Sequence, residues 1–335
     1  MTIKDLSAQT GYSVGTISRV LNNQPNVSEK ARDAVLKAAS ECGFQLNANA
    51  KQLKQQHGTS ILVVVKGTSN ELFGKLVEAI QARVAQTHYP LVVDYMDEDG
   101  NEVRRAVQLC LEKKPLGILF LGGNRQHFLA DFDKLRVPCV LVTNDAEGLD
   151  FPNLSSVSSD NVQAAKMAIE HLATLGHRKI AVIGGDRNVS DTTKLRYQGC
   201  VEAFEEHGID FDDELDYATV RFSYNGGYRA AQKLLARGRE FTGIFAMSDV
   251  MAIGAIRALK DAGKRVPEDV SVVGFDGLSI GEFTIPKLAT VVQSVEEMAD
   301  RSIRILQENI EGRQTVRHET VPVTMAWKES SRNIG

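Results

Sequence analysis

The chain has 335 residues, of which 43% are hydrophobic and 24% are charged, a composition typical of a globular protein with two or three domains. No apolar run approaches the roughly 20 residues that span a bilayer, and residues 1–5 lack the apolar core of a signal peptide. We therefore expect neither a membrane protein nor an exported one, but a cytoplasmic protein without a membrane partner.

Cysteine and histidine spacing gives no sign of a disulfide framework or a metal site. The four cysteines are scattered without a CxxC pair, at Cys42, Cys110, Cys139 and Cys200. This spacing favours small buried thiols in a reducing compartment. His171 and His177 lie six residues apart, so on one helix they would face different directions and would not share a metal ion. We expect no metal and no cofactor.

The net charge of −4 is distributed unevenly along the chain. Residues 1–57 carry seven Lys or Arg side chains against four acidic ones, a net charge of +3, whereas the remainder has 32 basic and 39 acidic residues, a net charge of −7. Because phosphate affinity depends on the local field, this asymmetry favours a nucleic-acid contact for the N-terminal segment. The alternative is a charged helix face that is merely solvated.

Residues 1–45 have the pattern of three short helices. Thr2 stands at a capping position, and Ile3 and Leu6 predict a helix that ends near Thr10, where Gly11 supplies a turn. Ser13 caps a second helix, in which apolar residues recur at i, i+3, i+6 and i+7 and predict one buried face: Val14, Ile17, Val20 and Leu21. The polar run 22–26, which contains a proline, ends this helix.

Ser28 caps a third helix that Gly43 ends, with four apolar residues facing inward: Ala31, Val35, Ala38 and Ala39. Three short helices with a glycine turn between the first two are typical of a helix-turn-helix, whose second helix enters the major groove. Arg19 has the fork geometry for guanine, whereas Val14 and Gly15 offer no side-chain hydrogen bond, so apolar contact is expected there. A three-helix packing module that binds nothing is the alternative.

The run 2–6 and the run 11–22, Gly-Tyr-Ser-Val-Gly-Thr-Ile-Ser-Arg-Val-Leu-Asn, resemble the headpiece of the lactose/galactose/purine repressor family of bacterial transcriptional regulators. The resemblance implies a sequence-specific DNA-binding protein, a repressor rather than an enzyme, that binds a near-palindromic double-stranded operator as a homodimer. The candidate DNA-contacting residues of the headpiece are Thr2, Ile3, Ser13, Val14, Gly15, Thr16, Ser18, Arg19, Asn22 and Ser28.

Residues 46–58 are expected to form a linker, because the segment 44–57 is too polar to hold a core. The resemblance implies that this segment becomes a hinge helix when two subunits meet DNA, with a leucine wedged into the minor groove. Leu53 matches that leucine, Ala50 lies one turn earlier, and Asn47 and Lys54 complete the candidates. Leu46 stands where many members have a proline, so we expect a looser hinge without DNA.

Residues 11–15 spell GxSxG, the nucleophile elbow of α/β-hydrolases, but that elbow follows a core strand and here a short polar helix precedes it. Ser13 is also explained as a helix cap. The acidic segment 97–100 resembles a calcium loop without the glutamate at its twelfth position, so we expect a solvated loop. No phosphate-binding GxxxxGK[ST] motif is present. We expect no catalytic residues.

From residue 59 the pattern alternates between strands and helices. Short apolar runs predict strands at 61–65, 91–94, 117–121, 139–142, 180–183, 243–247 and 271–275. Helical patterns between them include 73–85, 162–175, 197–206, 227–236 and 252–262. Such alternation indicates an α/β fold of parallel sheets covered by helices on both faces. There are too many strands for one sheet, so we expect two doubly wound lobes.

The family resemblance continues in this part of the chain, in residues 171–181, 195–199 and 272–276. It implies the fold of the periplasmic sugar-binding proteins in residues 59–335, with the chain crossing between lobes near Ser158, Ala289 and Thr320. The first lobe is then expected at about 59–158 and 290–319, and the second at about 159–288 and 320–330. A solute-binding protein is the alternative function of this fold, but it has no use for a basic helix-turn-helix.

Ligands of such sheets bind beyond the carboxyl ends of the strands, which in two lobes means the cleft between them. The resemblance implies that Arg196 and Asp276 grip the effector, that Phe222 covers its ring and that Phe73 and Ser248 contact it. Residues after the strands complete the candidate set with Ser69, Thr143 and Ser190. Taken singly, these residues have structural alternatives: Asp276 as a helix cap, Phe222 as core, Arg196 paired with Asp191.

The effector class expected from the resemblance is a sugar or a sugar phosphate, with nucleobases or nucleosides second. Lys66, at the end of the first strand, is either a contact for an anionic ligand or a surface lysine. The sequence does not tell an inducer from a corepressor. Only seven residues follow 323–328, too few for a heptad helix, so we expect a dimer rather than a tetramer.

Overall fold

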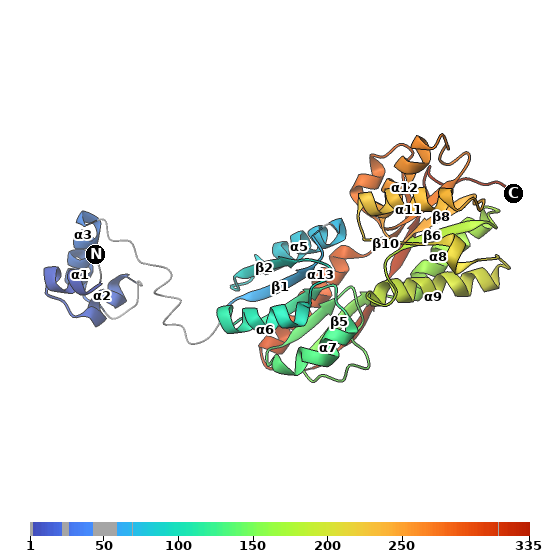
Figure 1. Cartoon of the computed structure of the whole chain (residues 1–335). Helices are drawn as coiled ribbons and strands as arrows, with labels where there is room; N and C mark the ends of the chain where they lie inside the picture. The colour runs from blue at the N-terminus through green and yellow to red at the C-terminus, as the bar shows by residue number, and fades with distance from the viewer. Residues whose placement is uncertain (1–2, 22–26, 43–58, 69, 314) are drawn as a thin grey trace. The chain divides into compact units, whose positions relative to one another are not determined.

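The computed structural model describes residues 3–21, 27–42, 59–68, 70–313 and 315–335 (Figure 1). The chain divides into two compact units, residues 1–58 and 59–335, and each is described by itself. None of the helices in these ranges is both long enough and apolar enough to span a membrane.

The first unit contains three helices: α1 (Ile3–Thr10), α2 (Val14–Leu21) and α3 (Glu29–Glu41). Leu6, Ile17, Val20 and Val35 are almost completely buried and pack together with Ala38 and Ala39. Gly11, with a φ of +73°, makes the turn between α1 and α2. This arrangement is the expected helix-turn-helix.

One side chain of α2 lies on a different face from the one expected. Val14 was expected on the buried face with Ile17 and Val20, but its side chain is 39% exposed. Val14 is the first residue of α2, and the buried side chains of this helix, Ile17 and Val20, lie further along it. Val14 is therefore presented to solvent.

The second unit begins with a six-stranded parallel sheet in the order β11-β5-β4-β3-β1-β2. Its strands are β1 (Ile61–Lys66), β2 (Leu91–Met96), β3 (Gly117–Leu121), β4 (Cys139–Val142), β5 (Leu154–Ser159) and β11 (His318–Val321). The covering helices are α5 (Glu71–Val84), α6 (Glu102–Lys113), α7 (Arg125–Asp131), η1 (Phe132–Lys134) and α13 (Val295–Ile310). Side chains of α5 and α13 form one core cluster with this sheet, and those of α6 and α7 form another. Helices thus cover both faces of the first lobe.

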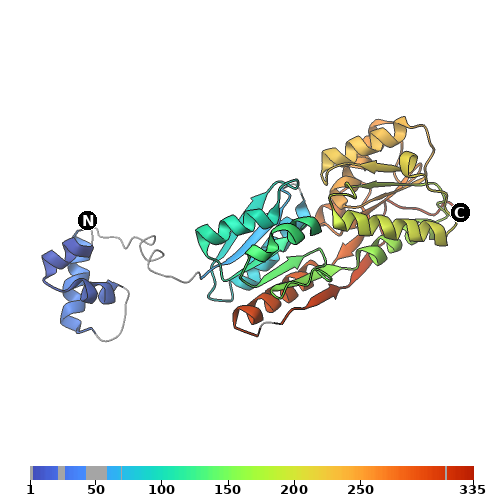
Figure 2. The same ribbon diagram turned by 60° about the horizontal axis from the view of Figure 1, so that its bottom comes forward.

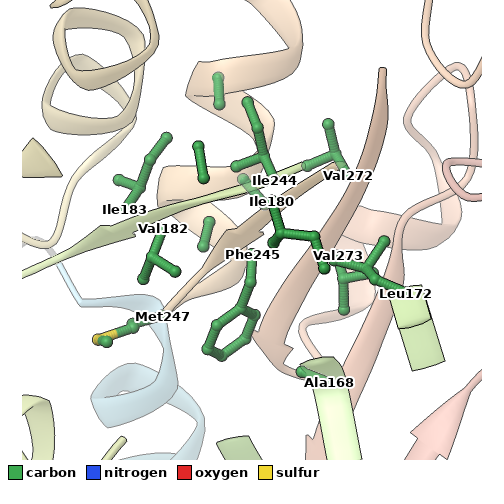
Figure 3. Close-up of a cluster of buried hydrophobic side chains, with 14 of the residues drawn as sticks. Ala168, Leu172, Ile180, Val182, Ile183, Ile244, Phe245, Met247, Val272 and Val273 are labelled. Atoms are coloured by element: carbon green, nitrogen blue, oxygen red, sulfur yellow. The ribbon is translucent and has the colours of Figure 1, made fainter. Parts of the chain in front are cut away.

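The second lobe repeats this plan with the order β12-β10-β9-β8-β6-β7, in which β12 alone pairs antiparallel. Its strands are β6 (Ile180–Gly184), β7 (Tyr217–Thr219), β8 (Gly243–Ala246), β9 (Ser271–Asp276), β10 (Ala289–Gln293) and β12 (Val323–Ala326). Its helices are α8 (Asn161–Thr174), α9 (Asp191–Glu206), α10 (Asp213–Asp216), α11 (Tyr224–Ala236), α12 (Asp249–Asp261) and η2 (Ser279–Glu282). Figure 3 shows its core, where apolar side chains of β6, β8 and β9 meet Ala168 and Leu172 of α8.

The chain passes between the two lobes three times: from β5 to α8, from β10 to α13, and at Pro322 between β11 and β12. Figure 2 shows β5 in green and β11 in red running side by side toward the second lobe. The boundary expected at 289/290 is too early, because β10 pairs with β9 and β12 in the second sheet. The boundary expected at 319/320 is also too early, because Thr320 and Val321 pair with β5 in the first sheet.

All seven strands expected from apolar runs are present, while β5, β7, β10, β11 and β12 lie outside those runs. The helix expected at 197–206 begins six residues earlier, at Asp191. The four cysteines are free, as expected, but only Cys139 and Cys200 are buried, whereas Cys42 and Cys110 are half-buried.

Candidate functional site

The exposed face of α2 carries the residues expected to contact DNA. Ser13, Val14, Gly15 and Arg19 are exposed. The Oγ atom of Ser13 accepts a hydrogen bond of 3.2 Å from the backbone N–H of Thr16, so Ser13 caps α2 as expected. The GxSxG serine is therefore a capping residue at a helix start with no strand before it.

The other DNA-contact candidates fall into two groups. Ser28 caps α3, since its Oγ accepts a hydrogen bond of 3.4 Å from the N–H of Ala31, and Ser18 is half-buried on α2. Ile3 begins α1. The remaining candidates lie outside the described residues: Thr2, Asn22, Asn47, Ala50, Leu53 and Lys54.

The second candidate site is a cavity of about 390 Å³ between the two lobes of residues 59–335. It lies at the carboxyl ends of the parallel strands, where ligands of such sheets bind. Lys66 ends β1, Gly122 follows β3, Thr143 follows β4, Gly185 follows β6 and Asp276 ends β9, and all of them line the cavity. Both sheets therefore contribute to the same site.

Arg196 of α9 is held in the cavity wall by three contacts and is only 5% exposed. Its Nε donates to Oδ1 of Asn161 at 2.9 Å, its Nη1 donates to the carbonyl of Met247 at 2.6 Å, and its guanidinium lies 3.6 Å above the ring centre of Phe275. Burial lowers the pKa of Arg196 to about 10, so the group stays charged at neutral pH. It does not pair with Asp191, whose carboxylate instead accepts from the N–H of Arg125.

Asp276 is buried at the end of β9, with a φ of +121°. Its Oδ1 accepts a hydrogen bond of 2.8 Å from Nε2 of Gln293, while its buried Oδ2 has no hydrogen-bond partner among the described residues. Burial raises the pKa of Asp276, and the charge of Arg196 opposes this shift. A buried carboxylate oxygen without a donor is costly, so this atom is suited to a donor group of a ligand.

Two aromatic side chains from different lobes line the cavity, and each lies against a glycine. A Cβ on Gly122 would be 3.0 Å from Cζ of Phe73, and a Cβ on Gly185 would be 2.8 Å from Cε2 of Phe222. The absent side chains at these glycines therefore leave room for the rings. Phe73 from α5 and Phe222 after β7 give the cavity apolar surfaces for the face of a ligand ring.

The comparisons with known proteins agree with this architecture. A family model for bacterial regulatory proteins of the lacI family matches residues 2–47, and one for a periplasmic binding protein-like domain matches residues 169–331. The HTH-type transcriptional regulator MalR of Clostridium butyricum is 33% identical over 341 residues, which cover all of both chains. The chain belongs to the LacI family.

Solved structures of LacI-family regulators have the same fold. The lac repressor dimer bound to operator and the anti-inducer ONPF matches with a TM-score of 0.81 and 25% identity over 99% of both chains. The transcriptional regulator CelR in complex with cellobiose matches with a TM-score of 0.73 and 27% identity, over 99% of this chain and all of that one. The expected family and fold class are thereby confirmed, and the chain is a LacI-family transcriptional regulator.

Not every residue expected at the effector site of this LacI-family regulator lines the cavity. Six of the expected residues line it: Phe73, Thr143, Ser190, Arg196, Phe222 and Asp276. Ser248 does not: its side chain is fully buried and caps α12, with its Oγ accepting from the N–H of Met251 at 3.3 Å. The expectation for Ser248 is therefore wrong, because the start of the helix uses the hydroxyl. Ser69 lies outside the described residues.

The acidic loop 97–100 is not merely solvated, as the sequence suggested. Glu98 and Asp99 line the cavity, and the guanidinium of Arg221 forms ion pairs with Asp97, Glu98 and Asp99. These residues follow β2 and β7, so the rule that ligands bind at the carboxyl ends of strands extends to them. Sequence reasoning missed them because their charges are typical of solvated loops.

Asp249, which follows β8 among the candidate residues after the strands, is a further buried carboxylate. Its Oδ2 accepts a hydrogen bond of 2.6 Å from the N–H of Leu278, and its Oδ1 accepts one of 2.6 Å from Oγ1 of Thr290. Burial, followed by the nearby charge of Asp276, raises the pKa of Asp249. Asp249 thus fixes the loop that follows Asp276 without lining the cavity.

Proposed function

We propose that this LacI-family regulator is a repressor whose affinity for a near-palindromic operator is controlled by a small molecule, a sugar or a sugar phosphate, bound between the lobes. The observation that carries this proposal is Oδ2 of Asp276, which has no hydrogen-bond partner among the described residues and lies near the Arg196 guanidinium. Both residues line the cavity together with Phe73 and Phe222. A carboxylate and a guanidinium bind hydroxyl groups, and an aromatic ring covers the apolar face of a sugar ring.

The DNA-binding half of the proposal rests on the exposed residues of α2. The lac repressor dimer, which shares the fold over 99% of both chains, is described as bound to operator, and this supports the same role for the headpiece here. Arg19 would read a guanine, Val14 would contact apolar base edges, and short hydroxyl side chains would bind phosphates. Residues 46–58, with Leu53 in the minor groove, would form the hinge.

Control by the effector follows from a two-state scheme. A ligand that binds the closed lobes more tightly than the open ones shifts the population toward the closed form, and the hinge starts move with the first lobe. The shift in operator affinity is limited by the difference in ligand affinity between the two states. Ligand binding to the headpiece is not required, because the coupling passes through the lobes.

A nucleobase or nucleoside is the second candidate effector. The two aromatic side chains of the cavity, Phe73 and Phe222, favour it, because a planar base stacks on phenyl rings. A sugar is proposed first because CelR, which is similar to this chain over its full length, is described in complex with cellobiose.

The proposed partner in the assembly is a second copy of the chain. Phe283 and Ile285, which follow η2, are 82% and 95% exposed, and Ile280 within η2 is 39% exposed. Large apolar side chains that gather on one exposed segment are typical of a protein–protein interface. A dimer would also bring two headpieces to the two half-sites of an operator.

A ligand screen of the full chain tests the effector half. Sugars, sugar phosphates, nucleobases and nucleosides are compared by the shift that each causes in the thermal unfolding temperature. The ligand that stabilises the chain should lose at least about tenfold in affinity in Asp276→Asn, because the amide cannot accept as strongly from its donor. Asp210→Asn, which changes a carboxylate of the same lobe that is 94% exposed, is the matched control. A ligand whose affinity survives Asp276→Asn would overturn the site.

A further inference from the structure

The charges around the cavity are unevenly matched. Three basic side chains line it in the part of the chain that the structure describes: Lys66, Arg196 and Arg221. Four acidic side chains line it as well: Glu98, Asp99, Asp186 and Asp276. Whether an anionic ligand fits depends on whether any of the three cations is free to meet it.

The charge of Lys66 is already neutralised inside the first lobe. Its ammonium group forms an ion pair with Glu102, whose side chain is fully buried, and donates to the carbonyl of Gly100 at 2.7 Å. The other oxygen of Glu102 accepts from the N–H of Asn124 at 2.6 Å, and its carboxylate also lies 2.8 Å from Nδ1 of His127. Because Glu102 is buried and fixed by these partners, it cannot turn away when a ligand enters.

The single positive charge of Arg221 is smaller than the total negative charge of the acidic loop. Its Nε lies 3.1 Å from Glu98, and its Nη2 lies 3.6 Å from Asp97 and also pairs with Asp99. Three carboxylates from the first lobe therefore surround one guanidinium from the second. Burial raises the pKa of Glu98, the charge of Arg221 opposes this shift, and the charge of Asp97 adds to it.

The remaining cation that lines the cavity, Arg196, lies close to the carboxylate of Asp276, which balances its charge. Its Nε and Nη1 donate to Asn161 and to the carbonyl of Met247, and Asp276 supplies the nearby negative charge. Among the described residues that line the cavity, the fully buried side-chain atom without a hydrogen-bond partner is an acceptor, Oδ2 of Asp276. The cavity therefore favours a ligand that donates a hydrogen bond to this oxygen.

We infer that the effector is an uncharged polyhydroxylated molecule, and that Glu102 and the acidic loop Asp97, Glu98 and Asp99 exclude phosphorylated ligands from the cavity. This inference rests on the proposed function and narrows its ligand class. A phosphate brought out of water into this site would meet cations whose charges are already balanced by carboxylates of the protein. The favourable interactions that the phosphate loses with water would therefore not be replaced. Hydroxyl groups lose much less hydration free energy than a phosphate does, and they can donate a hydrogen bond to Oδ2 of Asp276.

The test compares matched ligand pairs on the full chain by calorimetry: glucose with glucose 6-phosphate, ribose with ribose 5-phosphate, and uridine with uridine monophosphate. In each pair that binds, the unphosphorylated member should bind at least about tenfold more tightly. A phosphorylated member that binds more tightly would overturn this inference while leaving the proposed function intact. Absence of binding by these pairs and by every other ligand of the thermal screen would contradict the proposed function, and the inference with it.

A variant that binds the phosphorylated ligand more tightly would be a more specific test than the comparison of ligand pairs. Glu102→Gln keeps the shape of the side chain but frees the charge of Lys66, so the phosphorylated member should gain about tenfold relative to its partner. The double variant Glu102→Gln with Lys66→Met, which has no freed charge, should show no such gain. If Glu102→Gln does not fold, Glu98→Gln with Asp99→Asn, both on the loop, should shift the ratio the same way, with Asp133→Asn as the surface control. An unchanged ratio in the folded variants would refute the exclusion.

Discussion

At the scale of single residues, Arg19 and Val14 of α2 are proposed to contact DNA in different ways. Arg19 lies in the last turn of α2, where a cation is favoured by the helix dipole, and its side chain is exposed. Val14 is 39% exposed at the first turn and offers only methyl groups. Ser13 and Thr16 already hydrogen-bond to each other, at 3.0 Å between their hydroxyls. Specific polar readout by α2 is therefore expected to rest on Arg19.

Replacing Arg19 with Ala should weaken binding to the cognate operator by about 1–3 kcal/mol and spare binding to unrelated duplex, because a bidentate contact to guanine is lost. Titration of both duplexes at one salt concentration measures the two effects. Lys37→Ala, which removes an exposed cation of α3 that pairs with Glu41, is the control. Equal losses on both duplexes for Arg19→Ala would mean that this residue binds phosphate only.

At the scale of elements, the C-terminal segment is fixed against α8 and the loop after it by two buried histidines. Nε2 of His171 lies 2.8 Å from Oγ of Ser331, and Nε2 of His177 lies 3.2 Å from the carbonyl of Arg332. Trp327 packs edge-on against His171, with 4.2 Å between ring centres. These contacts explain how the chain after β12 packs against the second lobe.

The second lobe should lose stability between about pH 6.5 and pH 4. Burial lowers the pKa of His171 from 6.5 to about 4, so the unfolded chain takes up the proton at a higher pH than the folded one. The stabilisation is complete above the unfolded pKa and is lost as the pH falls through this window, by roughly 3 kcal/mol for this group. Burial also lowers the pKa of His177, which acts in the same direction.

Denaturation followed by the fluorescence of Trp327, the single tryptophan, measures this dependence at several pH values. His171→Gln should flatten the curve of stability against pH between about pH 6.5 and pH 4, whereas His88→Gln, on the exposed surface of the first lobe, should not. A slope in His171→Gln equal to that of the unmodified chain would assign the pH dependence to other groups.

At the scale of the whole molecule, the proposed regulator depends on contacts between copies of the chain as well as within it. The segment from Ile280 to Ile285 exposes three large apolar side chains, which a lone chain would leave in water. The two lobes meet in one compact unit of residues 59–335, so a dimer formed through this unit would present two headpieces together.

Phe283→Asp should convert the dimer into a monomer in sedimentation velocity, because it places a charge where an apolar contact is expected. Operator affinity should fall as well, since a monomer engages only one half-site. Leu129→Asp, which changes a 55% exposed leucine of α7, is the control and should leave the dimer intact. A dimer of unchanged affinity in Phe283→Asp would place the interface elsewhere.

Much of this fold follows from local patterns of the sequence. The caps Ser13 and Ser28, together with apolar residues at helical spacing, predict the headpiece helices, since a cap and a periodic stripe act within a few residues. Apolar runs predict seven of the strands in the part of the chain that the structure describes. They do not predict β5, Leu-Ser-Ser-Val-Ser-Ser, which is fully buried although four of its six residues are serine.

The candidate site also has one part that the sequence predicts and another that only the tertiary structure shows. The sequence by itself placed Asp276 at the end of an expected strand, because an apolar run is a local property. Its resemblance to the family predicted Arg196, Phe73 and Phe222 at the site, and all four residues line the cavity. Only the tertiary structure decided that Ser248 is a buried helix cap. It also decided that the acidic loop forms ion pairs with Arg221 and that Glu102 forms one with Lys66. Burial and charge pairing depend on which distant segments meet, and a single sequence does not contain that information in its local pattern.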